Sequence, residues 1–429
     1  LDHRIQMSFC ILGLVTGSNV LIKGCETIKT SFPNFLNIIE KNVTSLAVKD
    51  TDVKQAFGIN AKTLVSKSPV PALSNSAMDG VAIQTKETIE ITKDNPKRFE
   101  IKNTIYAGDK FIASDENDVS FEIMTGALMP KSFDAVIPIE QAKIITENNK
   151  RFLILDEEIK KDRNVRLAGE DFLPGDIILE KGSSINPYNL MAILMNGIDK
   201  VQIFQSPKIG IIATGSELDG NNESSIPNTN GPYIEACVKR LGLQCTNQLH
   251  AKDDPCEIKN KIKKCIDSGS DIIITSGGVS AGKADFVPSV LLDMGAEILF
   301  HKVWIRPGKP ILMAKLPDGK ILFGLPGNPV SVAVGFRFFV NNAIRLMQGQ
   351  AKENYLVAVN QLEFKKSRKF CFFAKAKTTV NDQGKLEVII LEGQESFKLN
   401  PFREANSWAI IPEGLEDSCP SKIMTSNLP

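Results

Sequence analysis

Three glycine-containing loops follow strand-like runs in the middle of the chain. They are Thr214-Gly-Ser-Glu-Leu218, Ser276-Gly-Gly-Val-Ser-Ala-Gly-Lys-Ala-Asp285 and Leu325-Pro-Gly-Asn-Pro329. Glycine lets backbone N–H groups approach an anion, and a following helix N-terminus adds partial positive charge. One such loop is more often plain architecture, but three on one edge of a sheet favour a phosphate-binding site. The candidate ligand-binding residues are Thr214, Gly215, Ser216, Glu217, Ser276, Gly277, Gly278, Ser280, Pro326, Gly327 and Asn328.

Acidic residues accompany these loops. Glu217 and Asp285 stand inside two of them, and Asp253 stands on a third connection. Carboxylates clustered beside a phosphate site repel one another unless a cation lies between them, so we predict Mg²⁺ held by these three residues. The alternative for each is a helix N-cap, which is preferred for Asp253 taken alone. The 3 histidines include no i, i+4 pair, which argues against histidine-based metal chemistry.

A group of three cations, Lys302, Arg306 and Lys309, follows further along the chain. The segment Arg306-Pro-Gly-Lys-Pro310 is turn-like, and its prolines fix the directions in which the cations project. A solvated basic face is the alternative. Fixed cations beside a phosphate site are suited to holding an oxyanion substrate.

The sequence around the loops predicts the elements that position them. Apolar runs at 209–213, 272–275, 311–314 and 321–324 alternate with helical patterns at about 232–241, 255–267, 285–294 and 330–347. This alternation predicts a parallel sheet covered by helices on both faces, a three-layer α/β domain whose ligands lie beyond the strand ends. Short β runs separated by turns predict a β-rich segment at about 75–160 and a small terminal sheet or barrel from about 352.

The composition excludes several classes of protein. Lys and Arg total 51 against 50 Asp and Glu, so nothing in the balance indicates binding to nucleic acid or an anionic membrane surface. The 8 cysteines form no C-x-x-C pair and are interpreted as reduced core residues of a cytoplasmic protein. The apolar stretch Met7 to Val15 is too short to span a membrane. Leu1 at the start suggests a fragment or a processed chain.

Two turn-like segments in the β-rich region have no assigned role from residue type alone. They are Asn75-Ser-Ala-Met-Asp-Gly80 and Met124-Thr-Gly-Ala-Leu-Met-Pro130, and a structural role is preferred for both. Together with the loops above, however, they form an ordered set of seven motifs over about 43–429. This set resembles the molybdopterin molybdenumtransferase family, the MoeA proteins and the E domain of gephyrin. Its remaining members are Val165-Arg166 with Gly169-Glu-Asp171, and Pro307-Gly-Lys-Pro310.

The resemblance implies a multidomain α/β homodimer. A two-part linker domain would comprise 43–74 and 159–205, with a β-rich domain at 75–158, the α/β domain at 206–348 and a C-terminal β domain at 349–429. The α/β edge of one subunit would meet the Asp79 and Thr125 motifs of the other. Carried over by position, the catalytic residues are Asp79, Thr125, Asp285, Lys302 and Lys309. Arg306 and Ser396 join the ligand-binding set.

The function implied is insertion of molybdenum from molybdate into adenylyl-molybdopterin, with Mg²⁺ as cofactor and release of AMP. The molybdopterin adenylyltransferase and apo-molybdoenzymes are implied partners. A pterin-binding scaffold without turnover and the adenylyltransferase itself are the alternatives. Residues 1–42 separately resemble the C-terminal end of EPSP synthase, through Leu1-Asp-His-Arg-Ile-Gln-Met-Ser-Phe9 and Thr30-Ser-Phe-Pro-Asn-Phe35. That activity is not expected here, because the rest of the enzyme is absent.

Overall fold

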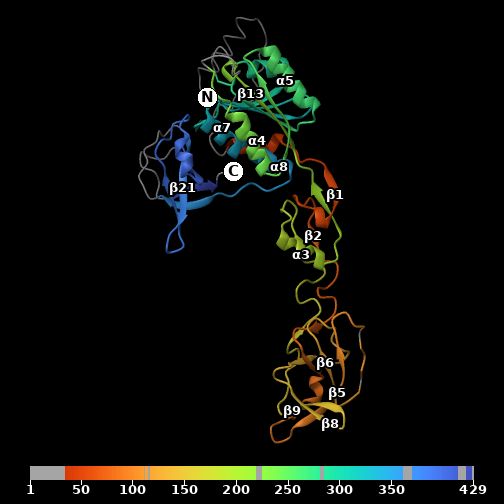
Figure 1. Ribbon diagram of the computed structural model, residues 1–429. Helices are drawn as coiled ribbons and strands as arrows, with labels where there is room; N and C mark the ends of the chain where they lie inside the picture. The colour runs from red at the N-terminus through yellow and green to blue at the C-terminus, as the bar shows by residue number, and fades with distance from the viewer. Residues whose placement is uncertain are drawn as a thin grey trace. The chain divides into compact units, whose positions relative to one another are not determined.

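The computed structural model describes residues 34–110, 112–114, 116–218, 225–280, 285–360, 370–413 and 422–427. They form two compact units. One unit contains the residues up to Lys49 together with Phe204 onward, and the other spans Asp50–Ile203 (Figure 1). The resemblance at residues 1–33 lies outside the described residues.

The first unit contains the predicted α/β domain. Its six-stranded sheet has the order β14-β13-β15-β19-β18-β16. The strands are β13 (Lys208–Thr214), β14 (Gln244–Ala251), β15 (Ile272–Ser276), β16 (Glu297–His301), β18 (Leu312–Lys315) and β19 (Ile321–Leu325). The helices are α2 (Asn34–Asn42), α4 (Asn230–Arg240), α5 (Pro255–Asp267), α6 (Val287–Asp293), α7 (Pro329–Gly335) and α8 (Asn341–Met347), with a π-helical turn, η5 (Phe336–Val340), between the last two.

Alternate residues of each buried strand enter different cores. In β15, Ile272 and Ile274 pack with α2, α4, α7 and α8, whereas Ile273 packs with α5 and α6. Successive side chains of a strand point to opposite faces, so a strand apolar at every position is covered on both sides. The three-layer prediction is therefore confirmed.

The prediction of an all-parallel sheet is wrong at one edge. The β13, β14, β15 and β19 pairings are parallel, but β18 runs antiparallel to β19, and β16 antiparallel to β18. Only the short connection Leu316-Pro-Asp-Gly-Lys320 joins β18 to β19. A connection this short makes a hairpin, because a parallel crossover needs a dozen or more residues.

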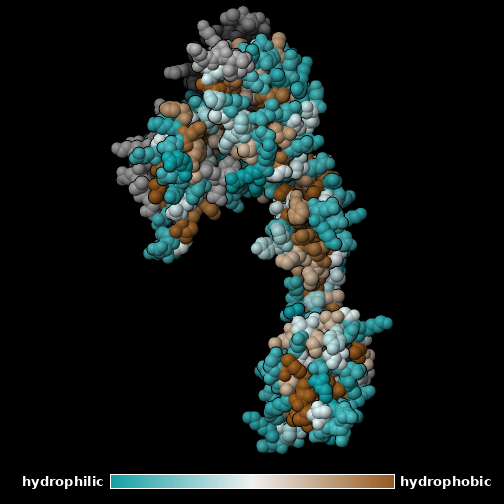
Figure 2. Space-filling view, in the orientation of Figure 1, coloured by the Kyte–Doolittle hydropathy of each residue, from teal (hydrophilic) through white to brown (hydrophobic). Residues whose placement is uncertain are grey.

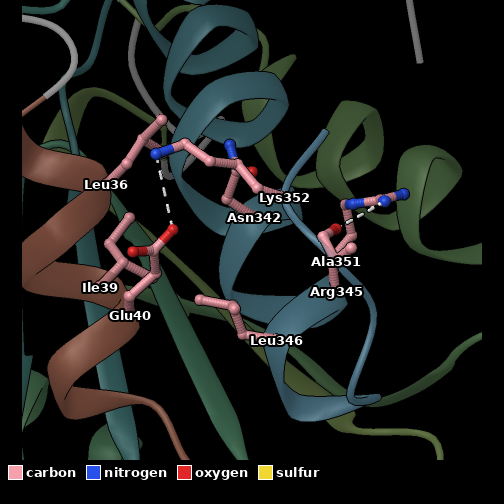
Figure 3. A pocket seen from close by; sticks show the side chains of 8 residues that line it. All are labelled: Leu36, Ile39, Glu40, Asn342, Arg345, Leu346, Ala351 and Lys352. Atoms are coloured by element: carbon pink, nitrogen blue, oxygen red, sulfur yellow. Dashed lines mark hydrogen bonds and ion pairs between the residues drawn. The ribbon is translucent and has the colours of Figure 1, made fainter. Parts of the chain in front are cut away.

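Helix α2 belongs to the core of this unit. Phe35 stacks on Phe339, with ring centroids 3.9 Å apart. Figure 3 shows Leu36 and Ile39 of α2 facing Leu346 of α8, with Glu40 paired to Lys352 at 3.6 Å beside them. Among the described residues, the stretch Pro329–Met347 is long and apolar enough to cross a membrane, but 83% of its most apolar window is buried in the protein.

The C-terminal residues of the same unit form a small closed sheet. Its strands are β17 (Ile305–Arg306), β20 (Leu356–Asn360), β21 (Cys371–Val380), β22 (Leu386–Ile390), β23 (Ser407–Ile411) and β24 (Lys422–Asn427), with a 3₁₀ turn, η6 (Asn400–Arg403), before β23. The order is β17-β21-β22-β20-β24-β23, and an additional pairing of β21 with β23 closes it like a barrel. The terminal barrel prediction is confirmed.

The second unit contains a six-stranded sheet and smaller ladders. The sheet has the order β7-β4-β6-β5-β9-β8. Its strands are β4 (Gly80–Ile83), β5 (Lys97–Ile105), β6 (Val119–Ile123), β7 (Ala135–Pro138), β8 (Lys143–Glu147) and β9 (Lys150–Leu155), with a 3₁₀ turn, η3 (Thr85–Glu87), after β4. The smaller ladders pair β3 (Asn75–Ser76) with β10 (Val165–Arg166) and β2 (Leu64–Val65) with β11 (Ile177–Leu179).

A separate core joins two distant parts of this second unit. Val53 and Ala56 pack with Leu179, Ile193 of α3 (Pro187–Met195) and Val201. Before this core, residues Val53–Gln55 form the 3₁₀ turn η2, which the Asp52 carboxylate caps by accepting from the N–H of Lys54. A two-stranded ladder pairs β1 (Val48–Asp52) with β12 (Lys200–Phe204).

Cysteine placement follows the prediction in part. Cys237, Cys265 and Cys371 are buried free thiols, and Cys245 is half-buried. Cys256 is exposed on α5, so its interpretation as a core residue is wrong.

Candidate functional site

The three glycine loops leave the sheet at one edge. In the register of the parallel strands, Ala213 lies beside Ser276, and Ser276 lies beside Leu325. The strands β13, β15 and β19 therefore end at the same level, and their loops are neighbours. The predicted common edge is confirmed.

A cleft of about 420 Å³ opens above this edge. Ten of the predicted residues line it: Thr214, Gly215, Glu217, Asp253, Ser276, Gly277, Gly278, Asp285, Gly327 and Asn328. Ser216, Ser280 and Pro326 belong to the same loops but are not on the lining.

Glycine is required where the first two loops touch. Gly277 has φ of +97°, and a Cβ there would lie 2.6 Å from the carbonyl oxygen of Thr214. The Thr214 hydroxyl donates to the carbonyl of Ser276 at 3.2 Å, and the Gly277 N–H donates to the carbonyl of Leu325 at 2.9 Å. The loops therefore meet backbone to backbone, which leaves the edge of the sheet open to a ligand.

Asp253 holds the first loop in place. Its carboxylate accepts from the N–H of Ser216 at 3.0 Å, and its own N–H donates to the Ser216 hydroxyl at 3.1 Å. The N-cap of α5 is Asp254, whose carboxylate accepts from the N–H of Glu257 at 2.7 Å. The alternative of a helix cap at Asp253 is therefore wrong.

The cleft is acidic. Its lining contains the carboxylates of Glu217, Asp253 and Asp285 and, among the described residues, no lysine or arginine. Within the described ranges, no group of three or more His, Cys, Asp or Glu side chains could hold a metal ion. A phosphate-bearing ligand would meet uncompensated negative charge here, so the donor set fits a cation that the ligand's own oxygens help to bind.

One hydroxyl on the lining is buried without a partner among the described residues. The Ser276 Oγ makes no hydrogen bond to any of them, although Ser276 lines the cleft. A buried polar atom left unpaired costs about 1–3 kcal/mol. A ligand oxygen in the cleft would remove that cost.

The predicted cations lie outside the cleft lining. Lys302 has φ of 70°, and the Val303 N–H donates to the carbonyl of Lys309 at 2.8 Å, so the segment is the turn that was predicted. The Lys309 ammonium lies over the Trp304 ring at 5.4 Å, and Arg306 is exposed.

A half-buried histidine next to Lys302 in the chain contacts one of the glycine loops. His301 contacts the carbonyl of Val279 in the second loop, 2.8 Å from its Nε2. Burial lowers the pKa of His301, the Val279 hydrogen bond opposes this, and the Lys302 and Asp285 charges act in opposite directions. Lys302 and the cleft carboxylate Asp285 thus act electrostatically on one imidazole.

Asp79 and Thr125 form a pair on the second unit. Gly80 begins β4 opposite Ile123 near the end of β6, and this register brings Asp79 and Thr125 together. The Asp79 carboxylate accepts from the backbone N–H and the hydroxyl of Thr125, both at 2.7 Å. Both hydrogen bonds lower the pKa of Asp79, and the bond from the backbone N–H has the larger effect. Asp79 is exposed.

Sequence reasoning missed one wall of the cleft. Asn228, Thr229 and Asn230 line it at the start of α4, and the Asn230 amide donates to the carbonyl of Gly327 at 2.7 Å. These residues could have been found from the sequence, because Asn and Thr often cap helices and here they stand just before a predicted helix. Ser396 acts through its backbone, because its carbonyl accepts from the N–H of Val330 at 3.2 Å in the first turn of α7.

Comparisons with known proteins agree with this architecture. Residues 210–346 match a family described as probable molybdopterin binding domain, residues 30–197 match the MoeA N-terminal region (domain I and II), and residues 1–39 match EPSP synthase. A molybdopterin molybdenumtransferase of Staphylococcus aureus (strain MRSA252) is 32% identical over 387 residues, covering 88% of this chain and 90% of that protein. One of Staphylococcus epidermidis is 33% identical over 363 residues, covering 83% and 85%.

Solved structures show the same fold. The molybdopterin biosynthesis MoeA protein of Pyrococcus horikosii superposes with a TM-score of 0.76 at 24% identity, covering 94% of this chain and 99% of that one. A molybdenum cofactor biosynthesis protein of Pyrococcus furiosus has a TM-score of 0.55 at 17% identity, covering 92% and 98%. The chain belongs to the molybdopterin molybdenumtransferase family.

Proposed function

We propose that this protein is a molybdenum insertase, which transfers molybdenum from molybdate to adenylyl-molybdopterin and releases AMP in molybdenum-cofactor biosynthesis. The observation that carries the proposal is the acidic cleft over three registered glycine loops, in a chain of this family. An adenylyltransferase would share only the α/β domain with this chain. The match to the MoeA N-terminal region at 30–197 therefore disfavours that alternative.

The cleft would hold the phosphate part of the substrate. The glycine loops leave backbone N–H groups accessible, α7 adds its N-terminal dipole, and the unpaired Ser276 hydroxyl supplies a donor. Thr214, Gly215, Ser216, Glu217, Gly277, Gly278, Ser280, Pro326, Gly327 and Asn328 stay in this predicted binding set, with Ser396 supporting α7. Their task is positioning and charge stabilisation, which needs no protein nucleophile.

Glu217 and Asp285, with Asp253 beside them, would hold Mg²⁺ together with substrate oxygens. Mg²⁺ usually takes one or two carboxylates plus substrate phosphates, which suits a site where the described residues alone complete no cluster. When bound, the ion would neutralise charge on the phosphate link. Lys302, Arg306 and Lys309 would bind molybdate. Of these, Lys302 lowers the pKa of His301, which Asp285 raises.

A second copy of the chain would complete the site with Asp79 and Thr125. Helix α3 supports a dimer, because Tyr188, Met191 and Met195 form an i, i+3, i+7 stripe with exposed fractions of 79%, 59% and 64%. Figure 2 shows apolar side chains gathered on the surface of this part of the molecule. Exposed apolar patches of this kind mark protein interfaces. Paired Met191→Lys and Met195→Lys substitutions should give a monomer by analytical ultracentrifugation, and an unchanged sedimentation coefficient would remove α3 from the interface.

The place of action that we propose is the cytoplasm, with the molybdopterin adenylyltransferase supplying substrate and apo-molybdoenzymes receiving product. The decisive assay incubates the purified protein with adenylyl-molybdopterin and Mg²⁺, with and without molybdate. Released AMP and the activity of a reconstituted apo-molybdoenzyme are then measured. Molybdate-dependent release with reconstitution supports the insertase, whereas tight pterin binding without release would favour the scaffold.

Asp285→Asn tests the metal assignment. It should leave the unfolding transition unchanged and abolish Mg²⁺-dependent AMP release. Asp293→Asn is the matched control, because Asp293 is an exposed acid that pairs with Lys259 at 2.5 Å, away from the cleft. Equal activity of the two variants would exclude Asp285 from catalysis.

A further inference from the structure

A second cavity of about 520 Å³ adjoins the cleft. Both are lined by Thr229, Asn230 and Pro329, so the two spaces are neighbours around the start of α7. The other walls come from α4 and from the C-terminal barrel. A volume of this size is typical of a small-molecule site.

The cavity differs from the cleft in its chemistry. Aromatic and aliphatic side chains dominate its lining, including Tyr233, Ala333, Leu399, Phe402 and Trp408. Among the described residues, its lining contains no carboxylate and one charged residue, Arg240, which is exposed at the end of α4. A mainly apolar space beside an acidic one suits a ligand with a flat neutral ring at one end and a phosphate at the other.

Trp408 supplies a polar donor in this apolar wall. Its side chain is fully buried and stands edge-on to Phe402, with centroids 5.6 Å apart and planes at 75°. Within the part of the chain that the structure describes, the indole Nε1–H has no hydrogen-bond acceptor. Buried tryptophan N–H groups usually find a partner, and leaving one unpaired is costly. A ligand carrying a ring carbonyl or ring nitrogen would provide the acceptor.

We infer that this second cavity binds the pterin ring of the substrate while the cleft binds its phosphate. The inference deepens the proposed function and rests on it. The matched molybdopterin-binding region, residues 210–346, includes both α4 and α7, which face the cavity. The C-terminal barrel then contributes to recognition of the ring through Leu399, Phe402 and Trp408.

The test measures the two ends of the substrate separately. 6-Hydroxymethylpterin is the ring probe, followed by its own fluorescence anisotropy, and AMP is the phosphate probe, followed by calorimetry. Ala236→Phe fills the cavity from an exposed position of α4, so it should not disturb folding. It should weaken pterin binding at least tenfold and change AMP binding less than twofold. Lys239→Phe is the matched control, because Lys239 is exposed on the same helix and does not line the cavity.

Trp408→Phe is the second variant, since it keeps an aromatic ring and removes only the N–H donor. We expect a loss of pterin affinity of about tenfold, the usual effect of one buried hydrogen bond. Thermal unfolding of the full chain checks that the variant is folded.

The outcomes separate the two levels of the proposal. Equal pterin binding by Ala236→Phe and Lys239→Phe would overturn the ring assignment, as would selective loss of AMP in Ala236→Phe. AMP binding without pterin binding in the unmodified protein would also overturn it, while leaving the insertase proposal in place. If the unmodified protein binds neither probe, the proposed function fails as well.

Discussion

Replacing Lys375 with methionine should loosen the loop that supports α7. Lys375 is fully buried in β21, and its ammonium donates to the carbonyls of Gly393, Lys398 and Glu395 at 2.6, 2.9 and 3.2 Å. Burial lowers the pKa of this lysine. Its three bonds hold residues 393–398, and within this loop the Ser396 carbonyl accepts from Val330. Methionine preserves the length of the side chain and removes all three donors.

The magnitude follows from the carbonyls left behind. Each buried acceptor that loses its partner costs about 1–3 kcal/mol. The loop is partly exposed, so water replaces some of the lost bonds, and a buried methionine is more favourable than a buried ammonium. We therefore expect a net loss of about 2–4 kcal/mol in the free energy of unfolding.

Urea unfolding followed by tryptophan fluorescence measures this loss. Lys377→Met is the control, because Lys377 lies two residues away on the same strand and is exposed. Hydrogen exchange should rise at 393–398 and at Val330 in Lys375→Met only, and AMP affinity should fall severalfold in the same variant. Equal urea midpoints for the two variants would refute the reasoning.

Three further predictions concern the site and its supports. Gly277→Ala should lower the free energy of unfolding by more than about 2 kcal/mol, because alanine must adopt a left-handed backbone conformation and its Cβ also clashes with Thr214. Gly319→Ala is the control, because Gly319 has φ of +87° and no atom within 4 Å, so alanine there meets only the backbone cost. Equal losses for the two variants would contradict the clash. Burial holds the pKa of His301 below its ordinary 6.5, so its contribution to stability is complete above pH 6.5 and is lost as the pH falls through the folded-state pKa. His301→Gln should therefore flatten the plot of unfolding free energy against pH in this range. The same plot for the variant and the unmodified protein would argue against this role of His301. Deleting residues 1–33 should leave molybdate-dependent AMP release intact, and a folded but inactive deletion variant would show that these residues contribute to activity. By contrast, Phe35→Ala in the full chain should lower the free energy of unfolding by about 3–5 kcal/mol, measured by denaturant titration.

Much of the α/β domain could be predicted because its signals are local. Isoleucine-rich runs followed by glycine loops specify strands and their ends, and parallel strands place those ends together. The direction of β18 was missed, because apolar periodicity carries no direction and only the Leu316-to-Lys320 connection distinguishes a hairpin from a crossover.

The cleft was harder to predict in its details. Asp253 and Asp254 are adjacent acids, either of which could cap α5, and only tertiary packing against Ser216 separates their roles. Asn230 lies far from Gly327 in sequence, so its contact has no local pattern. The Ser396 contact uses a backbone carbonyl, which any residue possesses.

The helix α2 has a consequence for synthesis of the chain on the ribosome. Phe35 is made before its stacking partner Phe339, which follows about 300 residues later. At 5–20 residues per second, the interval is roughly 15 to 60 s, during which α2 has no core to enter. The unit at Asp50–Ile203 is translated within that interval and can fold first, which draws the two ends of the interrupted unit together and shortens the loop that remains to be closed. A nascent chain stalled before α8 would therefore expose the apolar face of α2 to chaperones.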